Sequence, residues 1–351
     1  MRASLPLFFC ILLTLESALA WRTDLSPSEY HVFTDKKDQQ IDARILSISD
    51  EMTEIRIERR DGQVFEVAAT VLSLDDQQFI RDWLYPKPAP GAAKQGRLKV
   101  FGKMAGNKPV DLSAAGEIND FVQIGALKSG WIALRSNGEL LAQAEARRGH
   151  SNVASFHANT VWWNVTRNDG TVWGHPETQH CPDQLTDALT AVAGGSHHLA
   201  IMIDGTVKVW GRSYEGNDKL VDPPISISNA IDAATNQSSA AVVTEDGTVH
   251  CWTNDDDVKT KTGKPGGGLT MIEGGVFHYL GLGRDGEVYE WRGINLDKAK
   301  IPDALSGQGP FIRVSSGGTT KAAQKADGSW IAWGKNGAGI VDHINSLGPV
   351  I

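Results

Sequence analysis

The sequence predicts an all-β protein in which a small barrel is followed by a β-propeller. Three observations favour this fold class. Apolar residues alternate with polar ones through residues 31–84, a segment rich in Pro and Ala follows at 85–95, and an Asp-Gly or Asn-Gly pair then recurs at spaced intervals. The chain has 351 residues, 41% of them apolar, which is enough for two domains with sizeable cores.

Residues 1–20 have the features of a secretory signal peptide. Arg2 provides the positive charge, Leu5–Leu15 is a short apolar stretch, and Ala18-Leu19-Ala20 is a small-x-small cleavage motif before Trp21. The bulky residues before Cys10 do not fit a lipoprotein cleavage box. No other run has the length of a membrane span. We therefore expect a secreted or periplasmic protein whose mature chain does not insert into the membrane.

The charge and the cysteines narrow the function further. The formal net charge of −8 disfavours a nucleic-acid partner, because phosphate contacts need clustered Lys and Arg. Cys10 leaves with the signal peptide, so Cys181 and Cys251 remain. They fall in different repeats, and we expect unpaired thiols with Cys251 buried on a strand; a single disulfide is the alternative.

Residues 21–84 predict short strands and one helix. Apolar residues recur with a period of two around Ile45 and Ile57, and Asp61-Gly62 marks a tight turn between two strands. Ser73 is a plausible N-cap, with a helical apolar face after it. That face consists of Phe79, Ile80, Trp83 and Leu84.

This module resembles the Sla homology domain (SHD) family, a small SH3-like barrel. The matching residues are Phe33-Thr34-Asp35, Ile41-x-Ala43, Arg60-Asp61-Gly62, Phe65-x-Val67 and Leu72-Ser73-x-Asp75-x-Gln77-x-Phe79. The resemblance implies an adaptor-like role in protein binding, and exported bacterial proteins use a similar module. Trp21 and Trp83 are predicted to pack in the core of this barrel, with a ligand platform as the alternative. The alternate prolines of 85–95 predict an extended linker to the next module.

Residues 96–351 are built from repeats. A pair of Asp or Asn with Gly, at Gly138, Gly170, Gly205, Gly247, Gly286 and Gly328, recurs about every 40 residues, which is the spacing of propeller blades. A seventh related glycine, Gly96, lacks the Asp. An aromatic residue follows Gly96 and most of the other copies: Phe101, Trp173, Trp210, Trp252, Trp291 and Trp333. Each unit predicts about three consecutive strands, with the aromatic residue as a wedge between blades. The copy at Gly138 is degenerate and carries Leu140-Leu141-Ala142 instead.

The best copies resemble repeats of the regulator of chromosome condensation (RCC) type. These copies run from Ala193-Gly194-Gly195 to Trp210-Gly211 and from Gly274-Gly275 to Trp291. The resemblance implies a propeller, usually with seven blades, and short repeats of this kind also occur in a secreted bacterial β-lactamase-inhibitor propeller. We expect seven mostly three-stranded blades, the seventh formed by pairing 96–102 with 344–351; six blades are the alternative.

No catalytic residues, metal site or cofactor are predicted. His197 and His278 lie at nearly equivalent repeat positions, which favours a structural role. His175, His180 and Cys181 could hold a metal, and Asn254–Asp257 could bind Ca²⁺, but neither group has the spacing of a known metal motif. We expect ordinary loops at both places.

The leading functional hypothesis is an exported binding or scaffold protein that recognises a protein or a glycan through propeller loops. The loops after the aromatic strands, 211–226, 253–268 and 292–308, are the expected contact segments. Arg212, Tyr214 and Arg292 are the candidate binding residues within them. Two alternatives remain: a propeller enzyme that uses carboxylates on envelope polysaccharide, and a structural surface protein that self-associates.

Overall fold

A computed structural model divides the chain into two compact units, Met1–Lys87 and Pro88–Ile351. The structure describes residues 21, 26–35, 37, 39–49, 54–73, 76, 79–80, 83, 98, 100, 110–113, 115–127, 130–143, 150–159, 162–175, 185–195, 197–211, 216–253 and 258–349. The predicted signal peptide (1–20) and linker (85–95) lie outside these residues. Among the described residues, no helix has the length and apolarity that a bilayer crossing requires.

Unit 1 contains a four-stranded antiparallel sheet in which the strands pair in chain order. The strands are β1 (His31–Thr34), β2 (Gln40–Ile48), β3 (Glu54–Arg59) and β4 (Val64–Ala68), followed by the 3-10 turn η1 (Ala69–Val71). One face of the sheet is apolar and buries Phe33, Ala43, Ile45, Ile55 and Ile57, each at most 1% exposed. The predicted alternation of period two is confirmed for β2 and β3.

A helical segment follows the sheet and is described at residues 76, 79, 80 and 83. Ser73 caps it as predicted, because its Oγ accepts a hydrogen bond from the Asp76 N–H at 3.2 Å. Asp76 is buried, and its Oδ2 accepts the N–H of Thr34 at 2.6 Å. This carboxylate therefore joins the helix to β1, while Phe79 and Ile80 pack on the apolar face of the sheet.

Unit 2 is a succession of antiparallel sheets, six within its described residues, and the strands of each sheet pair in chain order. We call these sheets blades 1 to 6. Blade 1 is β5 (Phe121–Leu127), β6 (Gly130–Arg135) and β7 (Leu140–Ala142); blade 2 is β8 (Val153–Asn159), β9 (Trp162–Arg167) and β10 (Val172–His175). Blade 3 is β11 (Ala188–Ala193), β12 (His197–Met202), β13 (Val207–Gly211) and β14 (Gly216–Val221); blade 4 is β15 (Ala230–Thr235), β16 (Ser239–Thr244), β17 (Val249–Thr253) and β18 (Thr260–Gly263). Blade 5 is β19 (Leu269–Gly274), β20 (His278–Gly283) and β21 (Val288–Arg292); blade 6 is β22 (Phe311–Gly317), β23 (Thr320–Lys325) and β24 (Trp330–Gly334).

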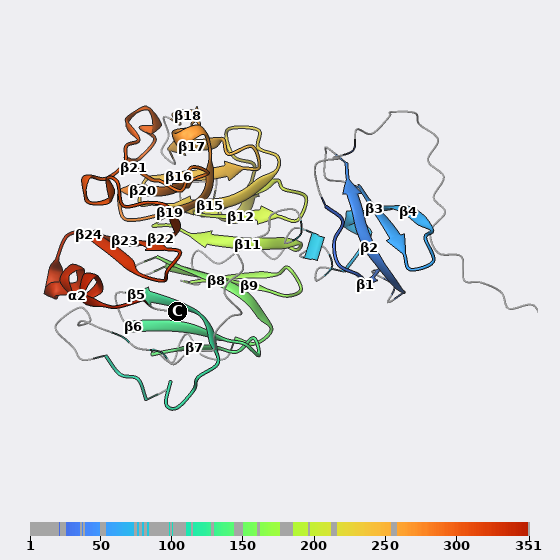
Figure 1. Ribbon diagram of the computed structural model, residues 1–351, viewed down its shortest axis with the longest axis horizontal. Helices are drawn as coiled ribbons and strands as arrows, with labels where there is room; N and C mark the ends of the chain where they lie inside the picture. The colour runs from blue at the N-terminus through green and yellow to red at the C-terminus, as the bar shows by residue number, and fades with distance from the viewer. Residues whose placement is uncertain are drawn as a thin grey trace, which may run out of the picture. The chain divides into compact units, whose positions relative to one another are not determined.

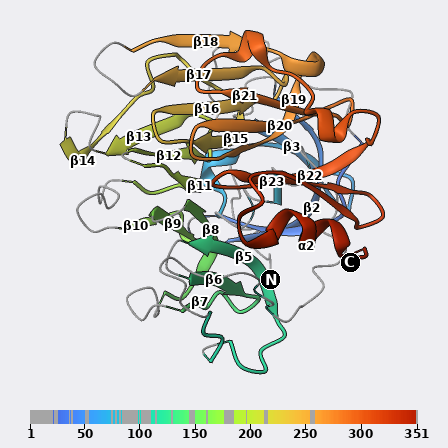
Figure 2. The ribbon, with the colours of Figure 1, turned by 90° about the vertical axis from the view of Figure 1, so that its left-hand side faces the viewer.

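The blades are arranged as in a propeller. The first strands of consecutive blades contact one another in the order β5, β8, β11, β15, β19, β22. The blades follow one another from green β5 to red β24, and the last blade comes back towards the first (Figures 1 and 2). The 3-10 turns η6 (Pro265–Gly267), η7 (Leu296–Lys298), η8 (Asp303–Leu305) and η9 (Gly337–Gly339) and the helix α2 (Ile340–Ser346) complete the described elements.

Each recurrent Gly turn ties its blade to the next one. Its glycine carbonyl accepts a hydrogen bond from the first residue of the next blade. The pairs are Val153 with Gly138 (3.0 Å), Ala188 with Gly170 (3.1 Å), Ala230 with Gly205 (3.0 Å), Leu269 with Gly247 (3.0 Å) and Phe311 with Gly286 (2.7 Å). Gly205 has φ +76°, and a Cβ there would lie 2.8 Å from Asn229 N. Only glycine satisfies both the turn conformation and the close contact.

The residue before the glycine shapes the same turn. Asp204 Oδ1 accepts the N–H of Thr206 at 2.9 Å, and the equivalent bond forms at Asp169, Asp246, Asp285 and Asp327. The carboxylate oxygen takes the place of a backbone carbonyl as the acceptor for the N–H two residues further on, and this bond stabilises the hairpin turn. The sequence repeat is therefore a repeated junction between blades as well as a repeated turn.

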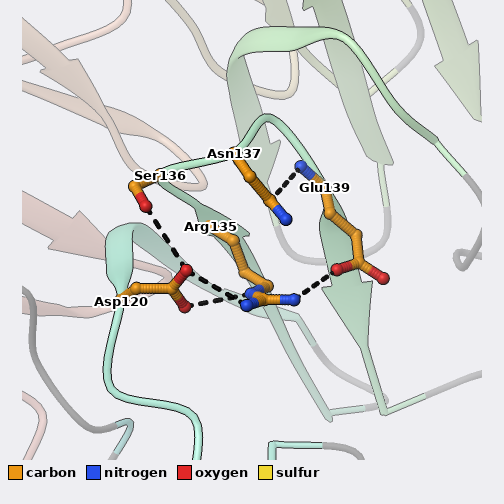
Figure 3. A network of polar contacts seen from close by, with 5 residues as sticks. All are labelled: Asp120, Arg135, Ser136, Asn137 and Glu139. Carbon is orange, nitrogen blue, oxygen red and sulfur yellow. Dashed lines mark hydrogen bonds and ion pairs between the residues drawn. The ribbon is translucent and has the colours of Figure 1, made fainter.

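Blade 1 forms although its sequence copy is degenerate. Asn137 Oδ1 accepts the N–H of Glu139 at 3.0 Å, as Asp does in the other blades. Arg135 donates to both oxygens of Asp120, at 2.9 and 3.1 Å, and to Glu139 Oε2 at 2.6 Å (Figure 3). The guanidinium holds the pKa of Asp120 below its usual value. This ionic network fastens the entry of the blade to its own hairpin (Figure 3).

The recurrent tryptophans pack between blades, which confirms their predicted wedge role. Trp252 in blade 4 contacts the apolar cluster of blade 3, and Trp291 in blade 5 contacts that of blade 4. Trp210, Trp252 and Trp291 are each at most 2% exposed. Trp333 packs against blade 5 in the same way. Aromatic burial at successive junctions thus supplies much of the apolar core.

The ends of unit 2 differ from the expectation. The predicted strand-like piece at 344–351 is wrong, because Ile340–Ser346 forms the helix α2. Its half-buried Ile340, Val341 and Ile344 are spaced as one helical face, a pattern that an alternating strand reading misses. Asn345 accepts the Ala332 N–H at 2.7 Å and donates to its carbonyl at 3.1 Å. The helix thereby covers the edge of β24, and residues 344–346 do not form a strand. Of the predicted partner segment 96–102, only residues 98 and 100 are described.

Three buried histidines cross blade junctions. His157 Nδ1 accepts the Ala193 N–H at 3.1 Å, His197 Nε2 lies 3.2 Å from the Ser239 carbonyl oxygen, and His278 Nε2 lies 3.0 Å from Ser316 Oγ. Burial lowers the pKa of each of these imidazoles to about 4. The predicted structural role of His197 and His278 is confirmed.

Replacing Gly205 with Ala will destabilise unit 2 by about 3 kcal/mol, because it adds backbone strain at positive φ and pushes against Asn229. The matched control is Gly267→Ala, which has φ +80° and nothing within 4 Å of the added Cβ. We expect only about 1 kcal/mol there. Urea unfolding measures both. Equal losses of unfolding free energy in the two variants would show that the close contact of Gly205 with the next blade contributes nothing beyond the strain of the turn.

Acid will destabilise unit 2 through the junction histidines. Their folded-state pKa is about 4 against 6.5 for a free imidazole, so the unfolded chain binds more protons between these values. Their contribution is fully present above pH 6.5 and falls by about 1.4 kcal/mol per histidine per pH unit towards pH 4. Urea unfolding across this range tests it, with His157→Gln expected to reduce the slope. A pH-independent free energy of unfolding would contradict the prediction.

Candidate functional site

The turns between the first and second strands of blades 3 to 6 form one connected rim. We call it the Gly-turn rim and define it by Gly194–Gly195, Gln237–Ser238, Gly275–Phe277 and Gly317–Thr319. Hydrogen bonds between backbones join the neighbouring turns: Gln237 N–H donates to the Val276 carbonyl at 3.0 Å, and Val276 N–H donates to the Gly318 carbonyl at 3.3 Å. These two bonds join the turns of blades 4, 5 and 6, and the side chains of Gln237, Ser238, Phe277 and Thr319 are exposed.

Phe277 distinguishes this rim from the rest of unit 2. Its side chain is 50% exposed, whereas the recurrent tryptophans Trp210, Trp252 and Trp291 are buried. It occupies the turn position that Ser238 and Thr319 occupy in the flanking blades, each directly before a second strand. Ser238 and Thr319 are also exposed. The rim thus carries an aromatic ring between two hydroxyl side chains.

Arg292 adjoins Phe277 across the end of blade 5. It lies at the end of β21 and pairs with His278 in the sheet register. The next residue, Gly293, donates its N–H to the Phe277 carbonyl at 3.3 Å. Arg292 is exposed, and no described residue forms an ion pair with it. Of the three residues predicted for binding, the structure places Arg292 at this rim, while Arg212 and Tyr214 lie outside the described residues.

The sequence analysis missed Phe277. The signal was present, since the equivalent position carries Ser196, Ser238 and Thr319 in the other well-formed repeats and an aromatic residue only in this one. A large apolar side chain at a position that is otherwise hydroxylated indicates exposure rather than core packing. Alignment of the turns, not of the strands, would have revealed it.

The predicted contact segments are in part strands that cover blade edges. Gly216–Val221 within 211–226 is the fourth strand β14, and Thr260–Gly263 within 253–268 is the fourth strand β18. Segment 292–308 contains η7 and η8, and Glu290 and Lys300 exchange backbone hydrogen bonds at 2.9 and 3.1 Å. Paired backbone at an edge blocks strand addition by another chain.

The proposed metal groups are not assembled in the described part of the chain, where no three His, Cys, Asp or Glu side chains come together as a metal site. His180, Cys181 and Asn254–Asp257 lie outside the described residues. Cys251 is a free, buried thiol on β17, as predicted, and burial raises its pKa to about 12. Such a thiol is neutral at physiological pH and unreactive.

One buried carboxyl group has an unusual acidity. Burial, together with the nearby Asp232 carboxylate, raises the pKa of Glu273 to about 8. Asp232 itself is occupied by the backbone: Oδ1 accepts the Ala233 N–H at 2.9 Å and Oδ2 accepts the Ile272 N–H at 2.8 Å. The second bond crosses from blade 4 to blade 5, so Asp232 acts as a junction residue.

Unit 1 holds an apolar pocket on its sheet. Its lining includes Phe33, Ile41, Phe65 and Leu72. The two tryptophans lie elsewhere in this unit. Trp83 packs against the core and donates from Nε1 to the Ser26 carbonyl at 2.9 Å, and the Arg56 guanidinium lies 4.0 Å from the centre of the Trp21 ring. The core role predicted for Trp83 is confirmed, whereas Trp21 is held at the surface by a cation–π contact.

Comparison with known proteins gives similarity of fold only. No family model matches the chain, and no curated protein matches it. A solved structure of Kap60 bound to yeast RCC1 (Prp20) is similar with a TM-score of 0.48 and 14% identity over 67% of this chain and 73% of that one. Human WBSCR16 gives 0.45 and 16% over 60% and 72%. The CRINKLY WD40 ectodomain of the Arabidopsis thaliana receptor kinase ACR4 gives 0.37 and 12% over 58% and 92%.

Proposed function

We propose that the protein is an exported, non-catalytic binding or scaffold protein that holds a protein or glycan at the Gly-turn rim. The observation that carries this proposal is an exposed aromatic residue, Phe277, whose backbone lies next to that of the exposed Arg292 where neighbouring turns are joined by backbone bonds. Aromatic and Arg side chains supply most of the binding energy at recognition surfaces. A frame whose turns are joined by backbone bonds presents them without a large ordering cost.

The carboxylates favour binding over catalysis. A glycosidase needs two carboxyl groups that both face the substrate. Here the Asp232 carboxylate, which lies near Glu273, already accepts backbone hydrogen bonds with both of its oxygens. The raised pKa of Glu273 therefore has a structural cause in the packing between blades.

We propose further that unit 1 is an SH3-like barrel of the SHD type with an adaptor role, and that unit 2 is an RCC-type propeller. Ile124 is 63% exposed, although its equivalents are at most 5% exposed; these are Phe156, Ala191, Ala233, Ile272 and Val314. This contrast indicates a place between blades 6 and 1 that no described blade covers, and it favours a ring of seven positions.

Export is tested at the N-terminus of the mature protein. If residues 1–20 are removed on secretion, N-terminal sequencing of the protein recovered outside the cytoplasm will begin at Trp21. An intact Met1 on exported protein, or protein confined to the cytoplasm, would contradict this part of the proposal.

The binding role is tested by capture with matched variants of the full mature chain. Wild type, Phe277→Ala, Arg292→Gln and the control Lys261→Gln are immobilised and exposed to native envelope extract and culture fluid. Lys261 is exposed on β18, in the middle of a paired strand. We expect a partner retained by wild type and by the control, and reduced at least tenfold by each rim variant because the aromatic or cationic contact is lost.

Equal retention by all four chains would place binding outside the Gly-turn rim and overturn the proposal for this site. Thermal unfolding of each variant provides the check on folding. Both rim residues are exposed, so the midpoints should agree with that of wild type.

A further inference from the structure

We propose that the ligand of the Gly-turn rim is an acidic glycan, with a sugar ring stacked on Phe277 and a carboxylate bound by Arg292. This inference rests on the proposed function and specifies its ligand class. It is carried by one exposed ring, by exposed hydroxyl and amide side chains in the neighbouring turns, and by the exposed Arg292, which follows Phe277 across the sheet end and has no ion pair with a described residue.

The aromatic ring is suited to one face of a pyranose. A sugar ring presents a patch of C–H groups on one face, and an exposed aromatic ring buries that patch while its negative π-face attracts the polarised C–H bonds. Phe277 is 50% exposed, so about half of its surface is available for such a contact. Its backbone is fixed on both sides, by Val276 to Gly318 and by Gly293 to the Phe277 carbonyl.

The flanking side chains are suited to the hydroxyl groups of a sugar. Ser238 and Thr319 occupy the equivalent turn positions in the blades on either side of Phe277, and Gln237 precedes Ser238. All three are exposed, and no described residue forms a hydrogen bond with their side-chain polar atoms. Hydroxyl and amide groups both donate and accept, as sugar hydroxyls do.

Two rim glycines, Gly317 and Gly318, leave room for the ligand to approach the backbone, whereas Gly194, Gly195 and Gly275 are packed against neighbours. A Cβ added at Gly317 or Gly318 would meet nothing within 4 Å. Packing against a neighbour therefore does not require glycine at these two positions, which border open space. Small residues in a rim beside an exposed aromatic ring allow a flat ring to lie close to the backbone.

The charges favour a carboxylate on the sugar. Arg292 is exposed beside Phe277, and Lys335, which donates its N–H to the Thr319 carbonyl at 3.1 Å, is exposed at the same rim of blade 6. The fork of a guanidinium binds a carboxylate through two parallel hydrogen bonds. Because the net charge of the chain is −8, it repels polyanions in general, and retention of one would report a local site.

A protein partner fits these features less well. Stable protein interfaces have an apolar, aromatic-rich core and bury about 800 Å² on each partner. The described part of the Gly-turn rim offers a single large exposed apolar side chain, surrounded by hydroxyl, amide and glycine residues. That composition supplies one stacking platform and many hydrogen-bonding groups.

The test measures calorimetric binding of three probes to the full mature chain at two salt concentrations. The probes are polyuronate oligosaccharides, dextran oligosaccharides and a polyglutamate peptide of matched length. We expect the polyuronate to bind at least tenfold more tightly than dextran, which lacks carboxylates, and than polyglutamate, which lacks sugar rings. Phe277→Ala and Arg292→Gln should each weaken polyuronate binding at least tenfold, Phe277→Trp should retain it, and Lys261→Gln should leave it unchanged.

Three results would overturn the inference: equal binding of dextran, equal binding of polyglutamate, or polyuronate binding that neither rim variant affects. A failure of this inference is distinguishable from a failure of the proposed function. If an envelope protein is retained through Phe277 and Arg292 while no oligosaccharide binds, the rim is a binding site and the acidic-glycan assignment is wrong. If the rim variants change neither capture nor oligosaccharide binding, both proposals fail.

Discussion

The junction made by the glycine of each recurrent turn is the constraint on which unit 2 depends. The same glycine turns the hairpin with a positive φ and offers its carbonyl to the next blade, and its missing side chain lets the next backbone approach. Three demands thus fall on one residue in each of blades 1 to 5. The other contacts between neighbouring blades vary from one junction to the next. Blades 4 and 5 use a buried tryptophan. At other points the side chain of Gln123 or Asp232 accepts a backbone N–H of the following blade.

Backbone bonds and buried aromatic residues hold the frame of the blades. The exposed turns can therefore carry different side chains without loss of the fold. The three histidines illustrate how polar groups are used inside the frame, where each satisfies a partner across a junction and stays neutral. Phe277 occupies the opposite position, an apolar ring left in water at a turn where neighbouring blades carry hydroxyl groups. It is the one large apolar side chain exposed in the described part of the Gly-turn rim.

The ends of the propeller follow a different principle from its middle. Interior blades are covered by their neighbours, whereas the edge of β24 is satisfied by the amide of Asn345 from a short helix. Blade 1, which lacks the tryptophan of the better repeats, relies on the ion pairs of Arg135 with Asp120 and Glu139. A repeated fold needs such individual solutions where repetition stops, since the last unit has no further unit to pack against.

The sequence by itself determined the β-rich class, the recurrent turns and the wedge tryptophans, because these depend on local turn chemistry and on a period that repeats along the chain. It also placed Arg292 among the candidate residues. Only the tertiary structure decided which exposed side chains lie together: Phe277 and Arg292 are 15 positions apart and meet through a sheet register and one backbone bond. It likewise decided that Ile340–Ser346 is a helix, since the need to cover the edge of β24 is a property of the assembled blade and not of that segment.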